Sequence, residues 1–129
     1  MDDFFFVKDG ENYIQIFFSA ILYIQAANKY STLVTSTKRL LMSQPLSAIE
    51  RALPAKLFCR VHRSYIISIP HTTSFNNTTV TIAGKIIPIG KNYRAALHKR
   101  VMIFDNGQKD FIKLSDFDMH VFFKNVRPN

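Results

Sequence analysis

Short runs of β-branched and aromatic residues, in which apolar and polar side chains alternate, dominate this sequence of 129 residues. Successive side chains of a strand point to opposite faces, so a period of two predicts strands rather than helices. Turn residues such as Asp9-Gly10, Asn76-Asn77 and Gly84 separate the runs, a spacing that is typical of an antiparallel β domain. The predicted strands cover residues 4–8, 13–18, 21–26, 30–35, 39–42, 64–69, 78–83 and 85–89.

The clearest pair of predicted strands lies at residues 78–89, where TTVTIA alternates, Gly84 interrupts and KIIPI follows. A glycine between two alternating runs is typical of a tight hairpin turn. Pro88 has no backbone N–H to donate to a neighbouring strand. We therefore predict a β-hairpin whose second arm lies at the edge of its sheet.

Two segments follow a helical period instead. Residues 44–53 place Leu46, Ile49 and Leu53 three and four apart, which predicts a short amphipathic helix whose apolar stripe packs on the core. Ser43 is available as its cap. Residues 90–100 combine an apolar face with Lys and Arg on the other faces, which predicts a short basic helix directly after the edge strand.

The composition fits one domain with a C-terminal extension. A chain of this length with 47% hydrophobic residues can build one ordinary core. The single cysteine, Cys59, fits a reducing compartment and is expected to be a buried small hydrophobe. The longest apolar run, residues 14–27, is interrupted by glutamines and a serine and is too short to cross a bilayer. Asp2 and Asp3 stand where a signal peptide carries basic residues, so a cytoplasmic location is expected and a membrane partner is not.

The net charge of +8 is concentrated in the middle of the chain. Residues 29–100 carry twelve Lys and Arg against one acid, Glu50. A basic surface attracts polyanions, although it can also be a solvated face that only keeps the protein soluble. Near exclusion of acids over some seventy residues favours a polyanionic partner.

Motifs for catalysis and for cofactors are not found. Cys59 and His62 are three apart, which in an extended strand sends them to opposite faces. The histidines are widely spaced and lack paired ligands at zinc-site spacing, and no glycine-rich phosphate loop follows a strand. We therefore expect no enzymatic activity, no metal and no cofactor.

Four separated segments together carry a resemblance to a known family. AILYIQAANKYSTLVT (20–35), PLSAIERALPAKLF (45–58), FCRVHRSYIISI (58–69) and IPIGKNYRAAL (87–97) resemble, in order and spacing, the LytTR-type DNA-binding domain of bacterial response regulators and transcription factors. The resemblance covers roughly residues 3 to 99. It implies a mainly β fold of elongated antiparallel sheets, with one short helix after the fifth strand and a short basic helix near residues 90–100.

The resemblance also implies sequence-specific binding to double-stranded DNA for transcription regulation. Loops and strand ends of this family enter successive major grooves, usually as a pair of domains on a direct-repeat promoter site, which makes a homodimer on DNA possible. Most relatives carry the domain after a phosphorylatable receiver domain, so the chain is expected to be the output domain of a two-component response regulator or a stand-alone regulator. The expected domain limits are 1–100 for the DNA-binding domain and 101–129 for an extension of unknown role.

Three places are implied as DNA contacts by the resemblance. The first is the turn before the fourth predicted strand, the second follows the histidine of RVHRS, and the third follows the IPIG turn. The corresponding residues in this chain are Asn28, Lys29, Tyr30 and Ser31, then Arg63 and Ser64, then Lys91 and Asn92.

Side-chain chemistry assigns roles within this set. The planar fork of Arg63 can donate two hydrogen bonds to guanine, so Arg63 is the leading candidate for base recognition. Strand alternation would place Arg63 with Val61 on one face and His62 on the other, which favours a structural role for His62. Further basic residues are candidates for phosphate contacts that position the domain: Lys29, Lys38, Arg39, Arg94, Lys99 and Arg100.

Two alternatives of another class stay open. Seventeen aromatic residues would suit a β-rich single-stranded nucleic-acid or RNA binder that stacks bases on Phe and Tyr. A protein-interaction module with an acidic partner would also use a basic surface. Within residues 101–129, a helix capped by Ser115 and a pair of strands at 109–114 and 119–124 are both compatible with the sequence.

Overall fold

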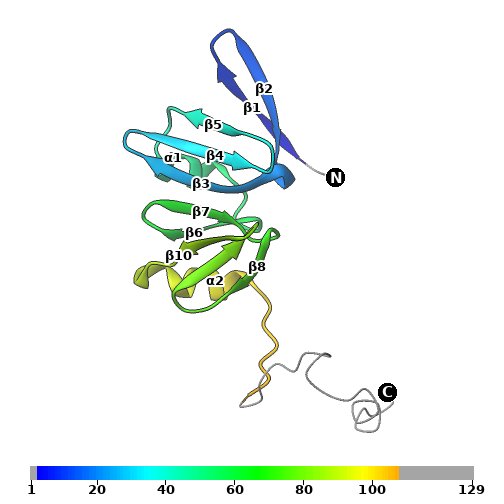
Figure 1. The fold of residues 1–129 in the computed structure, drawn as a ribbon, viewed down its shortest axis with the longest axis vertical. Coiled ribbons are helices and arrows are strands. Elements are labelled where there is room, and N and C mark those ends of the chain that lie inside the picture. Colours follow the sequence, from blue (N-terminus) through cyan, green and yellow to red (C-terminus); the bar gives the residue numbers. More distant parts are fainter. Residues whose placement is uncertain (1–2, 108–129) are drawn as a thin grey trace, which may run out of the picture.

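A computed structural model describes residues 3–107 as ten strands, two α-helices and two 3-10 helices (Figure 1). The alternatives considered for residues 109–124 lie outside this range. The strands are β1 (Phe4–Asp9), β2 (Asn12–Phe17), β3 (Ile21–Ala27), β4 (Tyr30–Thr35), β5 (Arg39–Met42), β6 (Phe58–His62), β7 (Tyr65–Ser68), β8 (Thr72–Phe75), β9 (Thr79–Ile82) and β10 (Lys85–Pro88). The helical elements are η1 (Phe18–Ala20), α1 (Leu46–Ala52), η2 (Lys91–Tyr93) and α2 (Arg94–Arg100).

A five-stranded antiparallel sheet in the order β5-β4-β3-β7-β6 forms the centre of the fold. Its residues alternate between two cores: Ile24 and Ile66 face one, and Tyr23 and Ile67 face the other. Both faces of the sheet are therefore covered. This explains why β3 and β7 read as nearly continuous apolar runs instead of a strict alternation.

Helix α1 and the β1–β2 hairpin cover the first face of this sheet. Leu46 and Ile49 of α1, together with Val7 and Ile16 of the hairpin, are buried in the same core. The predicted stripe of the helix is thus core packing. The helix starts at Leu46, with Pro45 at the N-cap position and no side-chain cap, so the expectation that Ser43 caps it is wrong.

The three-stranded sheet β10-β9-β8 and helix α2 cover the second face. The predicted hairpin at 78–89 is confirmed: β9 and β10 pair around Ala83-Gly84, and β10 lies at the edge as expected from Pro88. Leu97 of α2 is buried in the core that the three-stranded sheet covers. The molecule is thus stacked along its long axis, with the β1–β2 hairpin at one end and α2 near the other (Figure 1).

Most predicted strands agree with the structure to within one or two residues, but two differences matter. Residues 58–69 contain two strands, β6 and β7, of which only β7 lies in a predicted range, and a two-residue turn at Arg63-Ser64 joins them. Arg63 is therefore exposed in a turn while Val61 is fully buried, so the expectation that strand alternation puts them on one face is wrong. Strand β8 was not predicted, because its residues TTSF lack an apolar alternation.

Candidate nucleic-acid interface

The three places predicted to contact DNA lie along one edge of the molecule. The turn between β3 and β4 consists of Asn28 and Lys29, the turn between β6 and β7 consists of Arg63 and Ser64, and η2 begins at Lys91. Figure 1 shows these two turns and the start of η2 on the same side of the fold, one below the other.

Backbone contacts tie the three places together. The N–H of Ala26, at the end of β3, donates to the carbonyl oxygen of Ser64 at 2.9 Å. The N–H of Gly90 donates to the carbonyl oxygen of Val61 at 2.7 Å. A Cβ placed on Gly90 would lie 3.7 Å from the Cα of His62, so the chain entering η2 runs directly beside the end of β6. We call this surface, made by Asn28, Lys29, Arg63, Ser64, Lys91 and Asn92, the three-turn edge.

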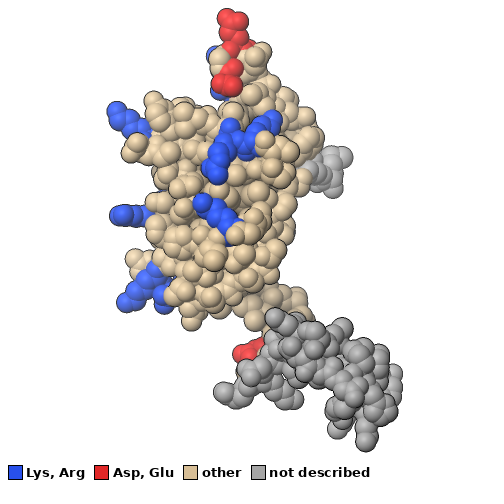
Figure 2. Space-filling model, viewed as in Figure 1, with Lys and Arg blue, Asp and Glu red and all other residues tan. Residues whose placement is uncertain are grey.

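The three-turn edge is cationic. Lys29, Arg63 and Lys91 are all exposed, one at each place. Figure 2 shows Lys and Arg side chains projecting from the side of the molecule on which the turns lie, at three successive heights, whereas acidic side chains gather at the tip of the β1–β2 hairpin. Three charges on separate turns of one rigid scaffold can reach a long anion at several points.

The predicted residues of the first place differ in accessibility. Asn28, Lys29 and Tyr30 are exposed, and Asn28 has a φ of 58°, a conformation that asparagine tolerates better than most residues. Ser31 is fully buried, and its Oγ donates to the carbonyl oxygen of Gln44 at 2.8 Å. Ser31 therefore ties β4 to the segment before α1, and its side chain is not part of the accessible edge, contrary to the expectation.

The second place is a turn that is held from several sides. The N–H of Ser64 donates to Nδ1 of His62 at 3.1 Å, and the His62 ring lies 5.8 Å from the ring of Tyr65. Arg60 donates from Nε to the carbonyl oxygen of His62 at 3.1 Å and from Nη2 to the carbonyl oxygen of Arg63. His62 thus has a structural role, as the sequence predicts, because its ring contacts Ser64 and Tyr65. The Arg63 side chain stays exposed.

Arg94 stands just behind the third place, at the start of α2. Lys91 and Asn92 are exposed, and Arg94 is partly buried. Among the described residues, the Nε of Arg94 is a buried nitrogen without a hydrogen-bond partner. An unpaired buried donor of this kind is unfavourable for stability.

Four further predicted phosphate contacts lie away from the three-turn edge. Lys38 follows β4, whose six residues separate it by roughly 17 Å from the β3–β4 turn at about 3.4 Å per residue. Arg100 donates to the carbonyl oxygen of Phe58 at 3.3 Å, so the end of α2 lies at the start of β6, opposite its turn. The structure thus does not bring Lys38, Arg39, Lys99 and Arg100 together with Lys29, Arg63 and Lys91.

Two contacts of Arg60 were not predicted from the sequence. Arg60 contacts the β6–β7 turn, and its Nη1 lies 3.2 Å from Oε1 of Glu50. The signal was present, because Glu50 is the one acid among residues 29–100 and an isolated acid in a basic segment is a candidate counterion.

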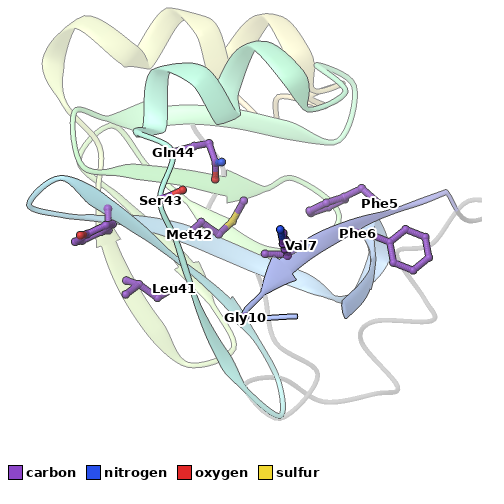
Figure 3. A pocket seen from close by; sticks show the side chains of 10 residues that line it. Phe5, Phe6, Val7, Gly10, Leu41, Met42, Ser43 and Gln44 are labelled. Atoms are coloured by element: carbon purple, nitrogen blue, oxygen red, sulfur yellow. The ribbon is translucent and has the colours of Figure 1, made fainter. Parts of the chain in front are cut away.

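Other parts of the described structure offer little chemistry. A groove of about 600 Å³ opens between β1 and β5 (Figure 3), where Phe5, Val7, Leu41 and Met42 line it. Its lining residues include no carboxylate and no histidine. Within residues 3–107, no three His, Cys, Asp or Glu side chains gather as a metal site requires.

Cys59 is buried, and burial raises the pKa of its thiol, while nearby Arg100 acts in the opposite direction.

In the part of the chain that the structure describes, no helix has the length and apolar character needed to cross a membrane.

Comparison with known proteins now identifies the family. The family model of the LytTr DNA-binding domain matches residues 11–102. The CO-responsive transcriptional regulator RcoM of Rhodospirillum rubrum is 31% identical over 80 residues, which are 57% of this chain and 34% of that protein. The sensory transduction protein LytT of Bacillus cereus is 29% identical over 99 residues, 72% of this chain and 40% of that protein.

A solved structure shows the same fold. It is the LytTr DNA-binding domain of a putative methyl-accepting/DNA response regulator from Bacillus cereus, with a TM-score of 0.65 and 22% sequence identity, covering 75% of this chain and 94% of that one. Both relatives are longer proteins: the matched region makes up 34% of RcoM and 40% of LytT. The order of strands and helices, the matching segments and the family model agree, and the chain therefore belongs to the LytTR family of DNA-binding domains.

Proposed function

We propose that the three-turn edge binds double-stranded DNA in a sequence-specific manner. The observation that supports this most is the joining of three exposed cationic turns on one edge by backbone hydrogen bonds. The major groove of B-DNA is about 12 Å wide and admits protruding protein elements, and its base edges distinguish all four base pairs. A set of turns held at fixed spacing can enter the groove without first being ordered.

Within this edge, Arg63 is proposed to recognise a base and Lys29 and Lys91 to contact phosphates, together with Arg94 just behind the edge. Arg63 projects from a turn whose backbone is held by His62 and Arg60, so its guanidinium fork starts from a fixed position. A bidentate contact with guanine contributes about 1 to 3 kcal/mol of discrimination against other bases. Phosphate contacts add affinity but carry no sequence information.

Single-stranded binding by stacked bases is less well supported by the geometry. Four exposed aromatic residues, Phe4, Phe6, Tyr13 and Phe17, lie on the β1–β2 hairpin, whose tip carries Asp9 and Glu11, whereas the exposed Tyr30 lies beside Lys29. Stacking platforms for single strands combine aromatic rings with a positively charged groove. The tip of the hairpin carries acidic side chains, which do not attract the backbone of a nucleic acid.

The regulatory setting is proposed from the relatives. RcoM is named a transcriptional regulator and LytT a sensory transduction protein, and both extend well beyond the matched region. We infer that this domain is the DNA-binding output of a regulator of transcription that acts as a pair of copies on a direct-repeat promoter site. A receiver domain in the full-length protein would control it.

Selection of bound duplexes from a random DNA pool, followed by gel-shift titration, tests the proposal. The selected duplex should bind more tightly than a scrambled duplex, its single strands or the matching RNA. The logarithm of its association constant should fall with the logarithm of the salt concentration by about 0.9 per phosphate contact. Equal affinity for duplex and single strand would count against the proposal.

The variant Arg63→Ala gives the residue-level test. Its side chain is exposed, so the fold should stay intact while the preference for the selected duplex over the scrambled one drops by about tenfold, which corresponds to about 1.4 kcal/mol. Circular dichroism and thermal unfolding check the fold. An unfolded variant would show that Arg63 is structural and that its assignment to the groove is wrong.

A further inference from the structure

We propose that Arg60 is a positioning residue for base recognition, which holds the β6–β7 turn in the conformation that projects Arg63, and that Glu50 of α1 holds Arg60 in turn. The inference rests on the proposed function, because it assumes that Arg63 contacts bases. It assigns a specificity role to a pair of residues that do not themselves reach the DNA.

The β6–β7 turn needs such support because of its backbone. His62 pairs with Tyr65, so only Arg63 and Ser64 connect the two strands. Two-residue hairpin turns that match the twist of the strands require a positive φ at one or both central residues. Among the described non-glycine residues, positive φ occurs only at Asn28 and Ala83, so the β6–β7 turn lacks this feature. Its strand also shifts register between Arg60 and His62.

The guanidinium group of Arg60 supplies what the turn geometry does not. Its Nε donates to the carbonyl oxygen of His62, its Nη2 to the carbonyl oxygen of Arg63, and its Nη1 to Oε1 of Glu50 at 3.2 Å. All three nitrogen atoms are thus engaged. The side chain of Arg60 is only 16% exposed, against 44% for Glu50, so Arg60 lies between the turn and the helix.

The other backbone groups of the turn are engaged as well. Ser64 donates its N–H to His62 Nδ1 and accepts a hydrogen bond from the N–H of Ala26. The carbonyl oxygens of His62, Arg63 and Ser64 are therefore all bonded within the protein. In this turn, Arg63 has the exposed side chain that can meet a ligand, beside the partly exposed Ser64.

Glu50 explains why this arrangement is specific to an arginine at position 60. It is the one acid in residues 29–100, and it bonds the guanidinium nitrogen that points away from the turn. The planar fork of arginine can serve two carbonyl oxygens and a carboxylate at once, whereas a lysine ammonium is a compact point charge on a flexible stem. Lysine at position 60 would keep the charge and lose the fixed geometry.

Arg60→Lys is therefore the decisive variant, with Arg100→Lys as its matched control. Arg100 also donates to a carbonyl oxygen of β6, that of Phe58, but at the end of the strand away from the turn. We expect Arg60→Lys to reduce the affinity ratio between selected and scrambled duplexes by about tenfold, as loss of a bidentate base contact would. The salt dependence should stay unchanged, because no phosphate contact is removed. Arg100→Lys should leave both quantities as in the wild type.

A double variant and a second substitution complete the test. If Arg60 acts through Arg63, the variant Arg60→Lys/Arg63→Ala should have the same affinity ratio as Arg63→Ala alone, since the two effects share one interaction. Glu50→Gln, at an exposed position, should lower the ratio in the same direction and decides the question if Arg60→Lys does not fold. An unchanged ratio in Arg60→Lys, or losses that add in the double variant, would overturn the proposal.

Backbone relaxation of the free protein separates this inference from the proposed function. NMR order parameters of the Arg63 and Ser64 amides should fall in Arg60→Lys and stay as in the wild type in Arg100→Lys, whether or not DNA is recognised. Unchanged order parameters would refute the inference that Arg60 holds the β6–β7 turn. A wild-type protein that binds selected and scrambled duplexes equally would instead refute the proposed function.

Discussion

At the scale of single residues, the position of a side chain in the fold decides whether it can meet a ligand. Ser31 and Tyr30 are neighbours in β4, yet Tyr30 is 46% exposed and Ser31 is fully buried. Strand alternation sends them to opposite sides of the sheet. The resemblance to LytTR domains implied both as contacts, and only the environment of each residue distinguishes them.

Ser31→Ala should therefore affect stability and not recognition. The substitution removes the donor to the Gln44 carbonyl oxygen, and loss of one such hydrogen bond costs about 1 kcal/mol in the free energy of unfolding. Urea denaturation measures this cost, and the affinity ratio between selected and scrambled duplexes should stay at the wild-type value. A changed ratio at unchanged stability would place Ser31 in the interface after all.

Cys59 gives a prediction for alkaline pH. Burial raises the pKa of its thiol above 9.0, the value expected for the unfolded chain, so the unfolded state loses the proton first as the pH rises. The stability contributed by the buried neutral thiol is complete below pH 9.0 and decreases above it. The gap in unfolding free energy between wild type and Cys59→Ala should be constant near neutral pH and narrow in the alkaline range. A gap that widens there would contradict the assignment.

At the scale of elements, the β9–β10 hairpin shows a turn that is not optimal. Ala83 has a φ of 50° and Gly84 a φ of 78°, which is the pattern of a type I′ turn. Asparagine tolerates positive φ better than alanine and is preferred before glycine in such turns. A left-handed conformation costs most residues roughly 1 to 2 kcal/mol and asparagine less, so Ala83→Asn should raise the unfolding free energy by up to about 1 kcal/mol, as thermal or urea unfolding would show.

Gly84→Ala provides the opposite control for this hairpin. It places a Cβ at a φ of 78° and should lower the unfolding free energy by about 1 kcal/mol or more, although no atom lies within 4 Å of the added carbon. If both variants had the same stability as the wild type, the turn conformation would not be as described.

How far the sequence predicts each element depends on how local its cause is. The alternation in β4, β5 and the β9–β10 hairpin, and the stripe of α1, are set by neighbouring residues, so these elements were predicted closely. The turn at Arg63-Ser64 contains no glycine, proline or asparagine, and it forms because Arg60, His62 and Ala26 bond its backbone. Ala26 is distant in the sequence, and Arg60 and His62 are not typical turn residues, so no local signal marked this turn. Strand β8 pairs with the next strand, β9, but three of its four residues are polar, so no apolar alternation marked it.

At the scale of the whole molecule, charge alone does not define the binding surface. The sequence concentrates twelve basic residues in residues 29–100, but the fold does not gather them all on one surface. Lys29 lies before β4 and Lys38 after it, although both were candidates for phosphate contacts from the sequence. The edge that carries all three turns could be recognised only once β3, β7 and β6 were placed in one sheet and the segment after β10 beside the end of β6.

Two triple variants of equal net charge test the central claim most directly. One removes Lys29, Arg63 and Lys91 from the three-turn edge, and the other removes Lys38, Lys56 and Lys99, which are exposed elsewhere, all by substitution with alanine. Titration of the selected duplex at several salt concentrations should show a large loss of affinity and a salt slope smaller by about 0.9 per lost phosphate contact for the first variant only. Equal losses in both variants would show that the basic charge acts as a whole, and would contradict a DNA interface at the three-turn edge.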